Sequence, residues 1–285
     1  MRRITELEKQ LRQIDSIVDL SGAFEGIASL RIAQIKNQVL QSQDFFAELW
    51  RLYKQIDPGE TVQFGQQVDD KDKLDRDLMI VITAEGGLSG DIDAKLIELM
   101  MQAYNPHEQD IIAIGRHGVV QLAHHNIPVK TYYKLPVHDQ NINVSPIVAE
   151  VRRYRSTTAY YQTYLSLGVQ DVKRISLRAA LAERMSGLIK NQETISERNY
   201  IFEPSVYDVI EHLESSMTGI ALSQIILESK LAQYASRFRA MSAAHDKAKD
   251  SFGDLTGRLN RARRNQRDER LKEIINGVHK TRRLI

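Results

Sequence analysis

The first part of the chain places an apolar residue at every third or fourth position between residues 4 and 53. Twelve of the fifteen positions in this series are apolar, and the residues between them are mostly polar. A spacing that averages 3.5 residues is typical of a helix that packs lengthwise against another helix. The series is Ile4, Leu7, Leu11, Ile14, Val18, Ser21, Glu25, Ala28, Ile32, Ile35, Val39, Ser42, Phe46, Leu49 and Tyr53. It predicts one helix over residues 1–57, ended by the proline and glycine of DPGE.

The last third of the chain repeats this pattern. Thirteen of sixteen positions are apolar, and no proline follows Pro204. The series is Leu213, Met217, Ile220, Gln224, Leu227, Leu231, Tyr234, Phe238, Met241, His245, Ala248, Phe252, Leu255, Leu259, Ala262 and Gln266. It predicts a second helix over residues 205–285, roughly 100 Å long against roughly 80 Å for the first. We expect the two helices to pair as an antiparallel coiled coil; the alternative is that each packs separately on a conventional bundle.

The middle of the chain has a different pattern, in which short runs rich in β-branched residues alternate with helical ones. Strands are predicted at residues 77–83, 110–115, 127–133 and 172–178. Such alternation indicates an α/β domain with a largely parallel sheet. We therefore predict a Rossmann-like domain over residues 77–204, inserted between the two helices and reached through a charged linker over residues 58–76. The fold class is α/β plus a long antiparallel coiled coil.

The segment VITAEGGLSGDID, residues 81–93, lies between a predicted strand and a predicted helix, where dinucleotide folds bind phosphate. Its glycines lack the G-x-G-x-x-G spacing, and Asp91 follows the last of them. A carboxylate at the start of a helix satisfies the positive end of the helix dipole and would repel phosphate. We expect a structural turn formed by Gly87, Leu88, Ser89 and Gly90, and no cofactor. An enzyme that uses the middle domain to bind a nucleotide is the alternative.

Composition and charge argue against other kinds of site. The chain has no cysteine, which excludes disulfides, thiolate metal sites and a cysteine nucleophile. His117, His124 and His125 cluster without a carboxylate at ligand spacing, so we expect no metal. Lys and Arg number 39 against 37 Asp and Glu, so the overall charge does not point to a nucleic-acid partner. The basic run Arg258–Arg270 lacks interleaved aromatic residues, so we expect a solvated or partner-facing helix surface and no catalytic residue or nucleic-acid partner.

The sequence also bears on where the protein works. The first residues are charged and lack the apolar core of a signal peptide. No stretch approaches the ~20 apolar residues that span a bilayer. We expect a soluble chain without a transmembrane segment.

The C-terminal third carries a more specific pattern. Residues 227–266 resemble the run E-S-x-x-x-E-x-x-A-R-M-x-A-M-x-x-A-x-x-N-A, followed by D-L-T and N-K-A-R-Q, of the gamma subunit of F-type rotary ATP synthases. The positions that match are Glu228, Ser229, Ser236, Arg237, Ala240, Met241, Ala244, Ala248, Asp254, Leu255, Thr256, Asn260, Ala262 and Arg263. The glycine turn is similar to that family's T-x-x-x-G-L-C/S-G-x-x-N, and IGRHGV (114–119) and FEPS (202–205) fit too. The resemblance covers essentially the whole length.

The resemblance implies a non-catalytic rotor subunit. Its partners would be the alpha and beta subunits of the catalytic hexamer, an epsilon-type subunit and the membrane rotor ring. The subunit would lie at the cytoplasmic face of the membrane as a peripheral part of the complex. It would couple ion translocation to ATP synthesis or hydrolysis by rotation. The alternatives are the shaft of a specialised F-type-like ATPase, or a coiled-coil interaction module unrelated to ATP.

The resemblance also suggests shaft residues that contact these partners. They are Ala23, Glu25, Ala28, Arg237, Met241, Asp254, Thr256, Asn260, Arg263 and Glu273. Near the N-terminus the chain departs from the family, because Asp15, Asp19 and Gly22 stand where it has lysines. Near the other end Asp268 and Arg270 replace a threonine and a glutamate. We interpret Asp15, Asp19 and Glu25 as partners for arginines of the second helix; the alternative is that they have diverged on a solvated face.

Overall fold

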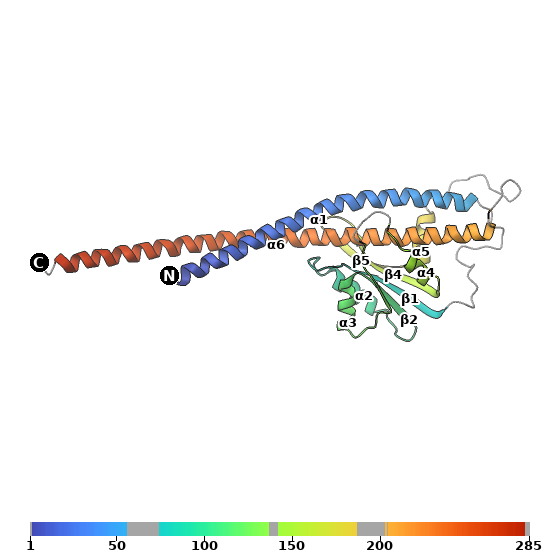
Figure 1. The fold of residues 1–285 in the computed structure, drawn as a ribbon, viewed down its shortest axis with the longest axis horizontal. Helices are drawn as coiled ribbons and strands as arrows, with labels where there is room; N and C mark the ends of the chain where they lie inside the picture. The colour runs from blue at the N-terminus through green and yellow to red at the C-terminus, as the bar shows by residue number, and fades with distance from the viewer. Residues whose placement is uncertain (1, 56–73, 137–141, 187–202, 204, 283–285) are drawn as a thin grey trace. The chain divides into compact units, whose positions relative to one another are not determined.

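The computed structural model describes residues 2–55, 74–136, 142–186, 203 and 205–282 (Figure 1). The chain forms two compact units, one of residues 1–27 with 238–285 and the other of residues 28–237. Both long helices are present, α1 as Arg2–Gln55 and α6 as Val206–Arg282, and each contributes to both units. The two predicted helices are therefore confirmed, although each belongs to two units.

The first unit is an antiparallel helix pair. Arg263 of α6 forms an ion pair with Glu8 of α1 at 2.7 Å, and His245 lies 3.0 Å from the carbonyl oxygen of Val18. Residue numbers therefore fall along α6 as they rise along α1. The positions of both predicted apolar series are buried or half-buried here, among them Leu259.

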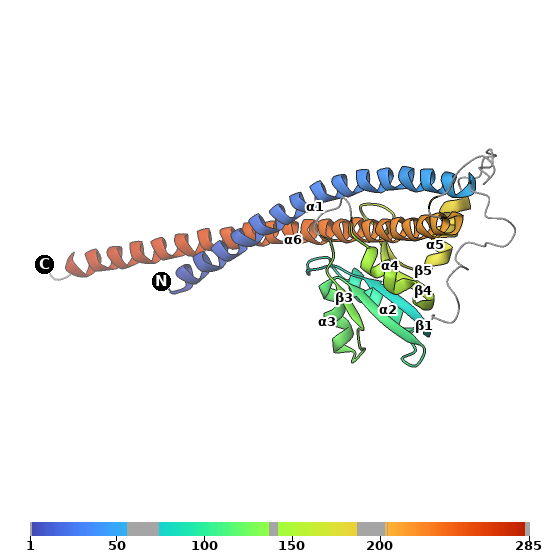
Figure 2. The same cartoon turned by 45° about the vertical axis from the view of Figure 1, so that its right-hand side comes forward.

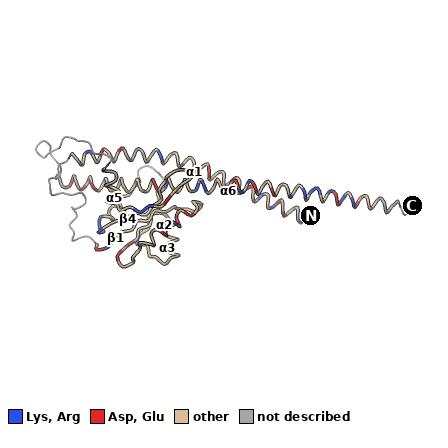
Figure 3. Tube along the Cα trace, turned by 180° about the vertical axis from the view of Figure 1, so that it is seen from behind, with Lys and Arg blue, Asp and Glu red and all other residues tan. Residues whose placement is uncertain are grey.

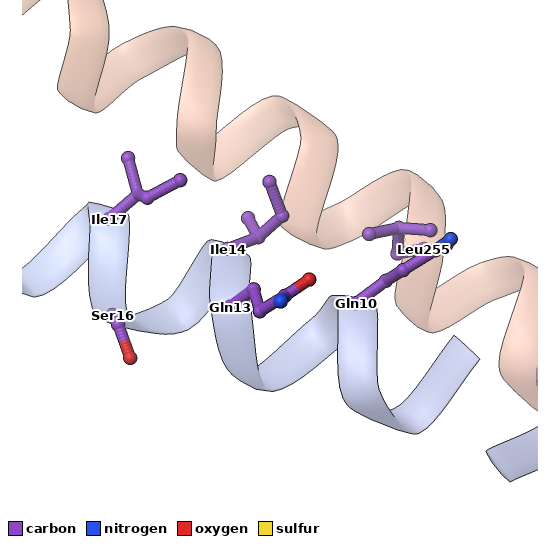
Figure 4. Close-up of a pocket in the computed structure, with 6 residues that line it drawn as sticks. All are labelled: Gln10, Gln13, Ile14, Ser16, Ile17 and Leu255. Carbon is purple, nitrogen blue, oxygen red and sulfur yellow. The ribbon is translucent and has the colours of Figure 1, made fainter. Parts of the chain in front are cut away.

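The helix pair also has an open groove on one side. In Figure 4, Ile14 and Ile17 project from α1 toward α6, and Leu255 lines the groove from α6. Ion pairing between the helices differs from the prediction. Among the described residues, Glu8 pairs with an arginine, whereas Asp15, Asp19 and Glu25 form no ion pair.

The second unit contains the rest of the helix pair, again antiparallel. Ile35 of α1 packs against Leu227 and Leu231 of α6. Nearer the end of α1, a buried cluster joins this helix to the start of α6. Its members are Phe46, Trp50, Tyr53, Leu181, Ile210, Met217 and Ala221. Within each unit the apolar series thus face each other, which confirms the predicted pairing.

The remainder of the second unit is built on a five-stranded sheet. Its strands are β1 (Leu74–Ile82), β2 (Gln109–Ile114), β3 (Thr131–Tyr133), β4 (Tyr154–Tyr164) and β5 (Gln170–Ser176). Their order is β3-β2-β1-β4-β5. The pairs β1–β2, β2–β3 and β1–β4 are parallel, and β4–β5 is antiparallel. The predicted largely parallel α/β sheet is therefore confirmed.

Two details of the sheet differ from the sequence-based expectation. The longest strand, β4, was not predicted, because YRSTTAYYQTY lacks the aliphatic run typical of a buried strand. Strand β1 begins at Leu74, inside the segment predicted as a linker. Its charged residues are compatible with a strand because they are paired: Arg155 contacts both Asp75 and Asp77, at 2.8 and 3.1 Å.

Helices cover both faces of the sheet (Figure 2). Helices α2 (Ile92–Met101) and α3 (Arg116–His124) lie on one face, and Leu96, Met100 and Leu122 fill the core beneath them. On the other face lie α4 (Ser145–Val151), α5 (Leu177–Ser186) and the part of α6 that carries Leu222 and Ile225. This part of α6 therefore belongs to the core of the α/β domain.

Candidate functional site

The carboxyl ends of β1 and β4 are where this sheet would bind a ligand. A parallel sheet with the order 3-2-1-4-5 binds its ligands in a crevice outside the carboxyl ends of the strands, where the strand order reverses. Here that point lies between β1 and β4. The glycine-containing turn after β1 leads directly into it.

The turn contains two residues with a positive φ, Leu88 and Gly90. Gly90 has φ +66°, and a Cβ there would lie 3.5 Å from Oγ of Ser236 in α6. Leu88 also has a positive φ, 70°, although it is not glycine. Asp91 pairs with Lys95 at 2.9 Å, one helical turn further on. A carboxylate therefore stands at the start of α2, where a phosphate-binding site needs free backbone N–H groups.

The crevice itself contains α6. Gln162, at the end of β4, donates from Nε2 to Oδ1 of Asp93 in α2 at 2.6 Å. Its Oε1 accepts hydrogen bonds from Ser229 and, at 3.3 Å, from Gln233. All four side chains are at most 3 % exposed. A buried polar network, completed by a helix of the same chain, thus occupies the position of the ligand.

Further along α6, two side chains hold the glycine turn. Ser236 donates to the carbonyl oxygen of Ser89 at 2.7 Å. The guanidinium of Arg237 donates to Oγ of Ser89 at 3.2 Å and to the carbonyl oxygen of Gly87 at 3.4 Å. The family-like residues Ser236, Arg237 and Ser89, predicted separately from the sequence, therefore meet in one joint between α6 and the sheet.

His117 of α3 closes the same network. Its Nδ1 lies 2.6 Å from Oδ2 of Asp93, an oxygen that also accepts a hydrogen bond from the backbone N–H of Ala84 at 3.3 Å. The hydrogen bond to Asp93 raises the pKa of His117 above its usual value, and partial burial offsets this only in part. The imidazolium form is thus favoured beside the buried carboxylate.

The raised pKa of His117 makes the stability of this unit depend on pH. A group whose pKa is higher in the folded state stabilises fully below its unfolded value, near 6.5, and loses this contribution as pH rises through the folded value. The difference in free energy of unfolding between the parent and His117→Gln should therefore decrease as pH rises through that range. Denaturant unfolding at a series of pH values measures it. The matched control is His124→Gln, because His124 is exposed on the same helix; equal pH dependence in both variants would refute the assignment.

A second polar cluster lies at the opposite edge of the sheet. Asp110 accepts hydrogen bonds from Nε of Arg76 at 2.9 Å and from the hydroxyl of Tyr154 at 2.8 Å. Burial by itself would raise the pKa of Asp110, but these hydrogen bonds and the charge of Arg76 hold it below its usual value. The cluster joins β1, β2 and β4, and every member is partnered, as expected of a structural network.

The residues predicted as partner contacts fall into three groups by exposure. Ala23, Asp254, Asn260, Arg263 and Glu273 are exposed, and Glu25, Arg237 and Thr256 are half-buried. Ala28 and Met241, by contrast, are 0 and 9 % exposed and pack within their own units. The exposed group can reach a partner, whereas the two buried residues contribute to helix packing.

In the described part of the chain, the arginines of the basic run in α6 are exposed and the histidines form no metal-binding group. The arginines between Arg258 and Arg270 are exposed, and acidic residues are interspersed with basic ones along this part of the helix (Figure 3). His124 and His125 are exposed, while His117 belongs to the network around Asp93. Within the described residues no group of three or more acidic or histidine side chains could hold a metal ion.

Two antiparallel long helices and a Rossmann-like domain whose crevice is filled by one of them define a helical-stalk protein. The chain belongs to the ATP synthase family, whose model, described as ATP synthase, matches residues 3–279. Curated relatives of nearly the same length are gamma chains. The ATP synthase gamma chain of Chlorobium phaeobacteroides is 22% identical over 296 residues and covers 98% of both chains. That of Mesoplasma florum is 24% identical over 287 residues, with 98% of this chain and 99% of the relative covered.

Solved structures share the fold. A chain of the Euglena gracilis mitochondrial ATP synthase, in the assembly of OSCP, F1 and c-ring, superposes with a TM-score of 0.64 at 14% identity. The match covers 97% of this chain and 93% of that one. A chain of the rotor of the same enzyme gives 0.59, again at 14% identity, with 92% and 98% covered. The comparisons indicate the gamma subunit of the central stalk, and membership of this family excludes a coiled-coil module unrelated to ATP synthase.

Proposed function

We propose that this chain is the rotating gamma subunit that transmits work between the membrane sector and the catalytic hexamer of an F-type ATP synthase, without catalysing a reaction itself. The observation that carries this is the filled crevice: Gln162, Asp93, Ser229 and Gln233 satisfy one another where a nucleotide would bind. ATP chemistry then belongs to the alpha and beta subunits. An epsilon-type subunit and the membrane rotor ring are the other partners.

The proposed mechanism is differential binding. An asymmetric shaft presents different side chains to each catalytic interface, and a site can bias another only by binding its conformations with different affinity. The exposed residues Ala23, Asp254, Asn260, Arg263 and Glu273 are the candidates for these contacts. Rotation would exchange the interface that each residue meets.

The same proposal places the subunit at the membrane through its partners. In the described part of the chain, no helix is long and apolar enough to cross a bilayer. Attachment would therefore come from contacts with the rotor ring and the epsilon-type subunit, at the cytoplasmic face.

Affinity purification of the full chain from its native cells tests the proposal. A tagged chain should bring down nucleotide-binding alpha and beta subunits together with ATPase activity, and the purified chain alone should hydrolyse no ATP. As a control for carry-over, the preparation is washed until the subunits dissociate, and activity should leave with them. ATP hydrolysis that stays with the isolated chain would refute the non-catalytic assignment.

A further inference from the structure

A histidine interrupts the apolar series of α6 inside the first unit. His245 is one of three polar residues among the sixteen positions of that series. Its Nδ1 lies 3.0 Å from the carbonyl oxygen of Val18 in α1 and 3.5 Å from Oγ of Ser21. The carbonyl oxygen can only accept, so the Nδ1–H group donates to it.

The turn of α1 opposite this ring is formed by small residues. A Cβ at Gly22 would lie 3.3 Å from Cε1 and 3.4 Å from Nδ1 of His245, tighter than most real contacts of this kind. Ser21 is 4 % exposed, and its hydroxyl is turned back onto its own helix, where it donates to the carbonyl oxygen of Ile17 at 2.6 Å. The ring therefore packs closely on Gly22, in a socket that a side chain at this position would narrow. By contrast, a Cβ at Gly26, one turn further along α1, would meet nothing within 4 Å.

We propose that His245 and the Gly22 socket set the axial register of α1 against α6 in this unit. A repeated apolar series alone specifies register weakly, because a shift by seven residues again places apolar residues opposite one another. In a register shifted by one heptad, Asp15 or Ser29 replaces Gly22 opposite the ring, and the Cβ of each would crowd the ring. A single polar residue in an apolar seam is the best-attested means of selecting one register.

The consequence for rotation rests on the proposed function, whereas the register itself does not. A shift of seven residues moves one helix along the other by about 10 Å, at 1.5 Å per residue. Such a shift would change which residues of α1 stand beside Asp254 and Arg263 on the surface of the pair. His245 is thus a positioning residue that would keep the shaft's partner-facing surface the same in every molecule.

Distance measurement on the full chain tests this proposal. The chain has no cysteine, so spin labels react only with cysteines that are introduced. Cysteines in place of the exposed residues Glu6 and Lys247 put one label on α1 and one on α6. Pulsed electron paramagnetic resonance should give one distance between the two labels in the protein with His245. In His245→Leu, which makes this position of the series apolar, a second distance displaced by about 10 Å should appear while helix content is retained. His245→Asn, which keeps an N–H donor, should restore the single distance.

A matched pair of glycine substitutions tests the socket. Gly22→Leu should exclude the ring and produce the second distance, whereas Gly26→Leu should not. One unchanged distance in His245→Leu would overturn the proposal, as would a second distance in His245→Asn or equal behaviour of the two glycine variants. These measurements use the isolated chain, so failure to co-purify with the catalytic hexamer would contradict the proposed function and leave the register result standing.

Discussion

Gly115→Ala should destabilise the α/β domain by about 4 kcal/mol, the largest effect that we expect from a single substitution. Gly115 follows β2 with φ +98°, and a Cβ there would lie 2.0 Å from the carbonyl oxygen of Thr83 and 2.9 Å from its Oγ1. A left-handed backbone at a non-glycine residue costs about 1–3 kcal/mol. Overpacking adds about 1–3 kcal/mol. Because the nearest atoms belong to the backbone of the neighbouring strand, they cannot move aside without breaking the sheet.

Urea unfolding of the full chain, followed by circular dichroism, measures this effect as a lower midpoint. The matched control is Gly87→Ala, because a Cβ at Gly87 meets nothing within 4 Å and its φ is not in the left-handed region. The control should change stability by no more than about 0.5 kcal/mol. Similar losses in both variants would mean that the close approach between Thr83 and Gly115 is not what restricts this position.

Asp93→Asn should cost about 3 kcal/mol, since it changes the buried acceptor on which the filled crevice depends. The carboxylate accepts from Gln162, His117 and the backbone N–H of Ala84. An amide keeps one acceptor oxygen and turns a donor toward a donor. Each buried polar group left unsatisfied costs about 1–3 kcal/mol, and breaking a buried charged pair costs about 3–5 kcal/mol.

Asp91→Asn is the control for this second prediction. Asp91 lies two residues earlier in the same turn, but its side chain is 61% exposed and pairs with Lys95 on the surface. Exposed pairs of this kind contribute about 0–1 kcal/mol. The same unfolding assay applies, at a pH where His117 is protonated in the parent. If Asp91→Asn lost as much stability as Asp93→Asn, burial of the carboxylate would not explain the difference.

The long helices could be predicted from the sequence because their signal is local and repeated. Each residue of the apolar series, from Ile4 to Tyr53 and from Leu213 to Gln266, lies in a buried or half-buried position. Strands β1 and β2 could also be predicted from the sequence, since their runs of Ile and Val indicate burial on both faces. Strand β4 could not be predicted in this way, because its burial depends on its neighbours in the sheet, β1 and β5. The local sequence of β4 does not show which strands lie beside it.

The candidate site shows the same limit more sharply. The glycine spacing and Asp91 led to the prediction of a structural turn. The network that fills the crevice could not be found from sequence, because Asp93, Gln162 and Ser229 are each more than sixty residues apart in the chain. Gln162 in particular lies in β4, a strand that could not be predicted from the sequence. Leu88 also adopts a positive φ that its residue type does not favour, so its own conformation could not be predicted from the sequence.

The position of Ser229 and Gln233 has a consequence for synthesis on the ribosome. Strands β1 to β5 all leave the ribosome before residue 206, yet the polar groups at their carboxyl edge and the core around Ile80 are completed by α6. Until that helix emerges, Gln162 lacks Ser229 and Gln233 as hydrogen-bond donors, and contacts between segments so far apart form slowly. The nascent sheet therefore stays incomplete until the final quarter of the polypeptide has been translated, and a chain released early would expose its apolar face to chaperones and proteases.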